Sequence, residues 1–256
     1  MFIDTHCHFD FPPFAGDEIA SLQQARQMGV EKMIVPTIGQ MNFQRVSVLA
    51  GAYSPIYAAF GLHPLYVAEH QAVHLHELGQ KLQEKNTKCV AVGEIGLDLY
   101  MPEPQFEKQK SLLEAQLKLA KQHDLPAILH SRKSHDPLAA ILRKHKLPRT
   151  GVIHGFAGSL SQAQAFIRLG FYIGVGGTIT YDRAQKTRNT ISQLPLSSLV
   201  LETDAPDMPL SGFQGQPNRP ENVAQVFSVL CELRREPSDE IANQIYQNSV
   251  ALFALD

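Results

Sequence analysis

Apolar residues gather along the chain in eight short runs, separated by longer polar or amphipathic stretches. The runs span residues 2–6, 32–37, 56–60, 89–94, 127–130, 151–154, 171–175 and 199–202. Most of them are continuous rather than alternating, which is typical of strands that are covered on both faces. We therefore predict eight β-strands, most of them buried on both sides.

Amphipathic stretches between the runs predict helices. The clearest covers residues 105–123, where apolar residues recur with a period near 3.6. Residues 136–146 and 220–235 follow the same pattern, and a last helix is predicted to restart at Pro237, Ser238 and Asp239.

The alternation of strands and helices predicts an α/β fold, and specifically a (β/α)8 TIM barrel. A length of 256 residues fits the roughly 250 residues of such a barrel, so we expect one domain over residues 1–256. An open, doubly wound sheet uses the same alternation and is the alternative. The longest loop is predicted over residues 206–220, after the last strand.

Composition and charge narrow the classes of function. Hydrophobic residues make up 44% of the chain and charged residues 19%, as in ordinary globular proteins. The net charge of −2 provides no global positive field for nucleic acid, so phosphate binding would have to be local. The three cysteines are far apart, and no secretory signal or membrane-length apolar run is found. We expect a cytoplasmic protein without membrane association or an evident obligate protein partner.

Five of the predicted strands end on or beside residue types that bind metals. These residues are His6, His8, Glu94, His130, His154 and Asp204. In a parallel barrel, all carboxyl ends of the strands meet at one rim, where active sites form. The sequence therefore predicts that six residues, spread over some two hundred positions, converge on one metal site.

The pair His6 and His8 illustrates the argument. Residues i and i+2 of a strand point to the same side, so both imidazoles face the site while Cys7 packs the other way. A second His-x-His motif, at His74 and His76, lies in a predicted helical stretch, where side chains at this spacing diverge. We expect the second pair to be surface residues.

The two carboxylates strengthen the prediction. A carboxylate at the end of a buried strand is costly unless it is paired or bound to metal, although Glu94 and Asp204 would also suit a salt bridge or a cap. Six ligands exceed the three that a tetrahedral catalytic zinc needs, and suit two metals bridged by a carboxylate and a water. Such metals lower the pKa of the water toward about 7 and attract anions. This favours phosphoester hydrolysis, with amide or lactone hydrolysis still open.

Six sequence motifs together resemble the TatD family of metal-dependent deoxyribonucleases, a branch of the amidohydrolase superfamily, and its YjjV-type members in particular. They are IDTHCHFD, FGLHP, VGEIGLD, ILHSR, IHGFAGS and LETDAP, in this order along nearly the whole chain. The resemblance implies a barrel with two divalent cations (zinc, manganese, magnesium or nickel) at the six residues above. It also implies that Glu94 bridges the metals and that Asp204 orients or deprotonates the attacking water.

Three further residues are candidates for the site. His63 follows the third strand and would contact a phosphate or leaving group, unless it is only a turn residue before Pro64. Asp98 would orient a metal ligand from behind, unless it is a solvated loop acid. Arg132 would pair with a phosphate oxygen, unless it is a surface cation.

The chain departs from the family pattern after LETDAP. Family members often carry a tyrosine where this chain has Asp207, and an Arg-Gly-Lys-like stretch where it has Gln214, Gly215 and Gln216. Only Arg219 would partly replace the lost cations as a substrate-binding residue. The leading hypothesis is a metal-dependent phosphodiesterase, a DNase of the 3'-5' exonuclease type. The alternatives are a hydrolase of small amides, lactones or phosphate esters, and a metal-binding protein without activity.

Overall fold

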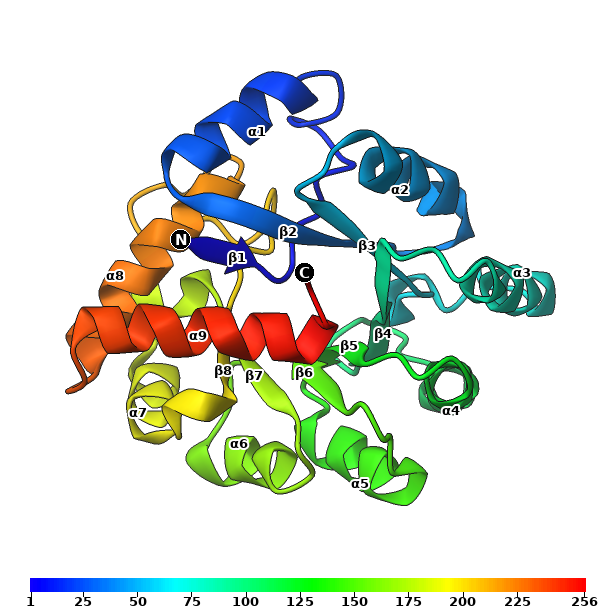
Figure 1. Ribbon diagram of the computed structural model, residues 1–256. Helices are drawn as coiled ribbons and strands as arrows, with labels where there is room; N and C mark the ends of the chain where they lie inside the picture. The colour runs from blue at the N-terminus through cyan, green and yellow to red at the C-terminus, as the bar shows by residue number, and fades with distance from the viewer.

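Eight parallel strands form a TIM barrel inside a ring of helices in the computed structural model, which describes residues 1–256 (Figure 1). The strands pair in sequence order from β1 to β8, so the open-sheet alternative is excluded. Their bounds are β1 Phe2–Asp4, β2 Val30–Pro36, β3 Ile56–Phe60, β4 Cys89–Asp98, β5 Ala127–Arg132, β6 Gly151–Ile153, β7 Tyr172–Val175 and β8 Leu199–Leu201. All eight predicted strands are present.

Helices follow every strand. They are α1 Glu18–Gln27, α2 Gln40–Ala52, α3 Ala72–Gln83, α4 Phe106–Gln122, α5 His135–His145, α6 Leu160–Ile167, α7 Gln185–Gln193, α8 Val223–Leu233 and α9 Ser238–Phe253, with 3-10 turns η1 Pro64–Tyr66, η2 Gly177–Thr180, η3 Leu196–Ser198 and η4 Pro220–Asn222. The predicted helices correspond to α4, α5, α8 and α9. The prediction for residues 220–235 joined the turn η4 and the helix α8 into one element.

Several strand ends near the site differ from the prediction, and β5, for example, continues past His130 to Arg132. Strand β4 does not end at Glu94 but continues to Asp98, because Ile95 and Leu97 are fully buried and Gly96 pairs with His130 in the ladder to β5. Strand β1 is shorter than predicted and ends at Asp4. Glu94 therefore projects from within a strand, whereas His6 and His8 lie just beyond one.

Hydrogen bonds between the segments that follow β1 and β8 close the barrel. The Thr5 amide donates to the Leu201 carbonyl at 3.0 Å, the Asp204 amide to His6 at 2.8 Å, and the His8 amide to Ala205 at 2.7 Å. Cys7 is fully buried in the core, as predicted. The seam of the barrel thus brings the predicted ligands of the first and last strands side by side.

The polar side chains of the predicted site lie at one end of the barrel, and the apolar core fills the other end. Strand side chains such as Ile34 and Val200 pack with Leu252 and Phe253 of α9. This helix crosses the amino end of the barrel (Figure 1). The opposite, carboxyl rim carries the polar side chains described below. The longest connection runs between β8 and η4 on this side, as predicted. No helix is long and apolar enough to cross a membrane.

Candidate metal centre

Glu94 lies at the middle of the polar cluster, and each of its two carboxylate oxygens faces a different set of histidines. Oε2 lies 3.1 Å from His6 Nε2 and 3.4 Å from His8 Nε2. Oε1 lies 2.9 Å from His63 Nε2, 3.0 Å from His130 Nδ1 and 2.6 Å from His154 Nε2. The carboxylate is buried, and it divides the cluster into an Oε2 side and an Oε1 side.

Asp204 completes the Oε2 side. Its Oδ1 lies 3.5 Å from His6 Nε2 and 3.7 Å from His8 Nε2, and its carboxylate is more exposed than that of Glu94. The backbone at Asp204 is left-handed, with φ of 59°, which turns the chain directly after β8. The structure therefore brings together His6, His8 and Asp204 from the two strands of the seam.

The histidines hold Glu94 in its charged form. Burial alone would raise the pKa of Glu94, but His154, His63 and His6 overcome this effect and hold the pKa well below its usual range. Burial instead raises the pKa of Asp204, although His154 and His8 oppose the shift. Of the two carboxylates, Asp204 is thus the better proton acceptor.

The predicted site residues His63 and Asp98 also lie in the cluster. The Nδ1 of His63 accepts a hydrogen bond from the Leu65 amide at 3.1 Å, so its Nε2 carries the proton and donates to Glu94. Asp98 Oδ2 lies 2.9 Å from Nε2 of His130, on the ring edge opposite Glu94. The Asp98 carboxylate thereby fixes the orientation of the His130 ring.

The residues fit a pair of divalent cations. His6 Nε2 and His8 Nε2 are 3.3 Å apart, and so are His130 Nδ1 and His154 Nε2. Two nitrogen ligands held about 2.0–2.1 Å from a tetrahedral zinc lie roughly 3.3 Å apart. The Nδ1 atoms of His6, His8 and His154 are buried without a hydrogen-bond partner. Four imidazoles and two carboxylates are donors for zinc or a related ion.

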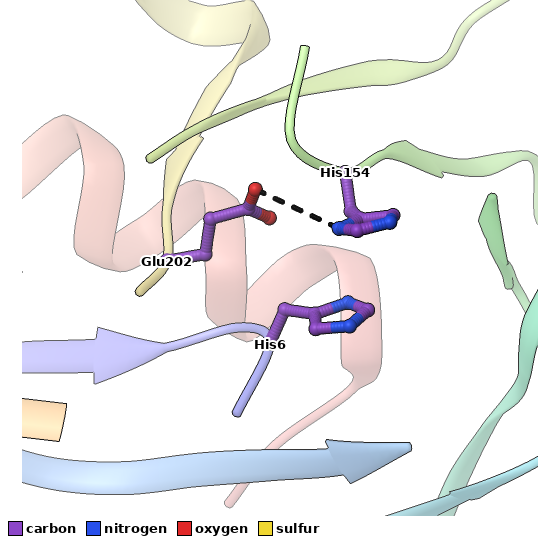
Figure 2. Close-up of side chains that lie close together, drawn as sticks. All are labelled: His6, His154 and Glu202. Carbon is purple, nitrogen blue, oxygen red and sulfur yellow. Dashed lines mark ion pairs between the residues drawn. The ribbon is translucent and has the colours of Figure 1, made fainter. Parts of the chain in front are cut away.

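Glu202 is a buried acid of the site that the sequence reasoning missed. It is fully buried, and its Oε1 accepts a hydrogen bond from the Gly155 amide and lies 3.9 Å from His154 Nδ1 (Figure 2). Burial raises the pKa of Glu202 to about 8, against the opposing effect of His154. A carboxylate directly after the apolar run of β8 was the available signal, since the same signal identified Asp204.

A glycine on the neighbouring strand makes room for this acid. A Cβ added at Gly174 would lie within about 2.9 Å of the Glu202 carboxyl carbon, closer than real Cβ contacts. We expect Gly174→Ala to cost roughly 1–3 kcal/mol of unfolding free energy, because the buried carboxylate has to shift. Chemical denaturation monitored by circular dichroism measures this loss.

Gly51 provides the matched control. It lies in α2, and nothing is within 4 Å of an added Cβ. Gly51→Ala should therefore raise the unfolding free energy, by up to about 1 kcal/mol. A Gly174→Ala protein as stable as the wild type would contradict the tight fit around Glu202.

The remaining predicted residues lie outside this cluster. His74 and His76 are in α3, as expected. The Arg219 guanidinium donates hydrogen bonds to the Glu221 carboxylate and to the side chains of Ser21 and Gln24 in α1. These contacts are not with the Glu94 cluster, and a substrate role for Arg219 stays a prediction. The guanidinium of Arg132 lies over the ring of Tyr100.

Comparison with known proteins gives the family. Residues 3–254 match the family described as TatD related DNase. The chain belongs to the TatD family. A TatD-family relative, the "Uncharacterized metal-dependent hydrolase YjjV" of Escherichia coli K12, is 65% identical over 252 residues, covering 98% of this chain and 97% of the relative.

Two further comparisons place the chain within the TatD family. The crystal structure of the TatD homologue YjjV from Escherichia coli K12 superposes with a TM-score of 0.99 at 64% identity, covering 100% of this chain and 98% of that chain. The "3'-5' ssDNA/RNA exonuclease TatD" of Pantoea vagans is 30% identical over 250 residues, covering 94% of this chain and 95% of the relative. The predicted barrel and the resemblance to YjjV-type members are therefore confirmed.

Proposed function

We propose that this TatD-family protein is a metal-dependent phosphodiesterase that acts on single-stranded DNA from the 3' end. The observation that carries the proposal is the division of histidines around Glu94, with a separate set facing each carboxylate oxygen. This arrangement suits two cations that share one carboxylate, which is the site expected for in-line displacement at phosphorus. The name of the Pantoea vagans relative supports a nucleic-acid substrate.

The six residues have separate parts in holding the cations. His6, His8 and Asp204 would hold one cation on the Oε2 side, His130 and His154 the other on the Oε1 side, and Glu94 would contact both. When bound, the cations offset the charge of the phosphate and lower the pKa of a water at the site. Zinc, manganese, magnesium and nickel all suit mixed imidazole and carboxylate donors.

Asp204 would accept a proton in the reaction, and His63 would hold the substrate by a hydrogen bond. Water adds to phosphorus, and the bond from phosphorus to the leaving oxygen breaks. Asp204 takes the proton of the water, because its carboxylate is the more basic and more exposed of the two. His63 holds its Nε2–H in the cluster by donating it to Glu94, and with substrate bound it would donate this hydrogen bond to a phosphate or leaving oxygen instead. The leaving alkoxide is protonated from solvent.

Hydrolysis of small molecules at the same site is the second candidate function. The observation in its favour is the segment with Gln214 and Gln216, which lacks the cations that polynucleotide binding would use, together with a net charge of −2. A small amide, lactone or phosphate ester needs only the metal centre.

One assay separates these functions. Metal-repleted protein is incubated with single-stranded DNA, double-stranded DNA and a panel of small phosphate esters, amides and lactones. We expect release of mononucleotides from single-stranded DNA. Turnover of the small substrates without any release of nucleotides would instead establish the second function.

The missing cations lead to a prediction about salt. Binding of long DNA should weaken only slowly with salt, because few phosphates are neutralised. Gln214→Arg combined with Gln216→Lys should tighten DNA binding and steepen the slope of log affinity against log salt by roughly 1.4, at about 0.7 for each phosphate on a single strand. Turnover of a small phosphodiester should change little, since neither glutamine belongs to the metal centre.

A salt titration of single-stranded DNA affinity, wild type against the double variant, measures this effect. A slope that the two substitutions leave unmoved would show that the segment around residues 214–216 does not reach the bound strand.

A further inference from the structure

An exposed aromatic residue with two cations lies on the rim beside the Oε1 side of the metal centre. Tyr100 follows the end of β4 and is 53% exposed. The Arg132 guanidinium carbon lies 4.1 Å from the centre of the Tyr100 ring, and the Lys133 ammonium lies 4.5 Å from it. We name Tyr100, Arg132 and Lys133 the rim platform.

The two cations of the platform form no ion pair. Burial would raise the pKa of Asp98, but the hydrogen bond to His130 and, more weakly, the charge of Arg132 hold this pKa below its usual value. Arg132 and Lys133 are both exposed, and neither forms an ion pair within 4.0 Å, although five of the ten other arginines do. Contact with a tyrosine face holds them by cation–π attraction, which leaves their charge unneutralised. Their positive charge is therefore available to an anion.

The platform is fixed to the metal centre through Asp98. Asp98 Oδ1 accepts a hydrogen bond from the Tyr100 amide at 2.9 Å, and Asp98 Oδ2 faces His130 Nε2 at 2.9 Å. Asp98 and Arg132 are also register partners in the pairing of β4 with β5. Arg132 follows His130 by two residues, which is roughly 7 Å along a strand. A ligand on the platform would lie one step along the rim from the metals.

We propose that the rim platform is a nucleotide subsite of a single-stranded nucleic acid, next to the phosphodiester that is cleaved. This inference rests on the proposed function. An exposed tyrosine face stacks an unpaired base of any sequence, and cations beside it bind the neighbouring phosphates, which is how single strands are held without sequence preference. A duplex does not offer a free base face. The platform also supplies, at and directly after the end of β5, cations that the segment around residues 214–216 lacks.

The test compares long and short substrates in two variants of the metal-repleted full-length protein. Tyr100→Leu removes the aromatic face, and Arg132→Gln with Lys133→Gln removes both charges. We expect the KM for a single-stranded oligonucleotide to rise about 5- to 150-fold in Tyr100→Leu, from the roughly 1–3 kcal/mol that base stacking contributes. The KM for bis(4-nitrophenyl) phosphate should stay near the wild-type value, because this substrate has no neighbouring nucleotide to stack on the platform. The double charge variant should make the salt slope shallower by roughly 1.4.

A matched control removes the same charge from the other end of the barrel. Lys88→Gln with Lys144→Gln affects Lys88, whose ammonium lies 4.2 Å from the Tyr57 ring before β4, and Lys144 near the end of α5. This control should leave the KM for the oligonucleotide and the salt slope unchanged.

The outcomes separate the subsite from the function on which it rests. An oligonucleotide KM that is unchanged in both platform variants, with DNA still hydrolysed, overturns the subsite and leaves the function standing. A wild-type protein that hydrolyses no phosphodiester overturns the proposed function itself. An equal rise of KM in the platform and control variants also overturns the subsite, because net charge alone would then explain it.

Discussion

Replacing Glu94 with alanine should remove at least one cation and almost all hydrolysis while the barrel still folds. Glu94 is the carboxylate that faces both sets of histidines, one with each oxygen, so its loss leaves each set without its shared carboxylate. We expect activity to fall by about a thousandfold or more, which corresponds to roughly 4 kcal/mol of activation barrier. Metal analysis of the purified variant and its circular dichroism spectrum accompany the activity assay.

Glu107→Ala is the matched control for this variant. Its carboxylate lies on α4 and is 80% exposed, so the substitution should change neither metal content nor activity. Two bound metals per chain in a folded Glu94→Ala protein would disprove the bridging role of Glu94.

The two His-x-His pairs should respond in opposite ways to substitution. His6→Ala combined with His8→Ala removes both imidazoles that face Oε2 of Glu94, so we expect loss of the cation on that side and of nearly all activity. His130 and His154 remain on the Oε1 side, and one metal per chain should be retained there. Metal content and hydrolysis of single-stranded DNA are measured on the same preparation.

His74→Ala combined with His76→Ala makes the same chemical change in α3. Side chains two residues apart on a helix diverge, and neither His74 nor His76 contacts the cluster. Metal content and activity should match the wild type. Equal damage from both double variants would mean that the distinction between a strand end and a helix does not decide which pair binds metal.

Much of the fold was predictable because its signals are local. Continuous apolar runs predicted all eight strands, since a strand covered on both faces needs apolar side chains on both. The rule that carboxyl ends of parallel strands share a rim then predicted that His6, Glu94 and Asp204 lie together. The ends of the strands were less predictable. Extension of β4 to Asp98 depends on the burial of Ile95 and Leu97, which only the packed helices provide.

The sequence by itself determined the barrel, the rim and the residue types that gather there. Strand periodicity and the residue at each strand end depend only on residues that are neighbours in the sequence. Only the tertiary structure decided which of these residues face which carboxylate oxygen of Glu94. That Oε2 of Glu94 faces His6 and His8, and Oε1 faces His130 and His154, follows from closure of the barrel between β1 and β8. The tertiary structure also decided that Glu202 lies behind His154 and that Arg132 lies on Tyr100. These are distances between side chains on different strands, and they depend on register and packing that no local pattern encodes.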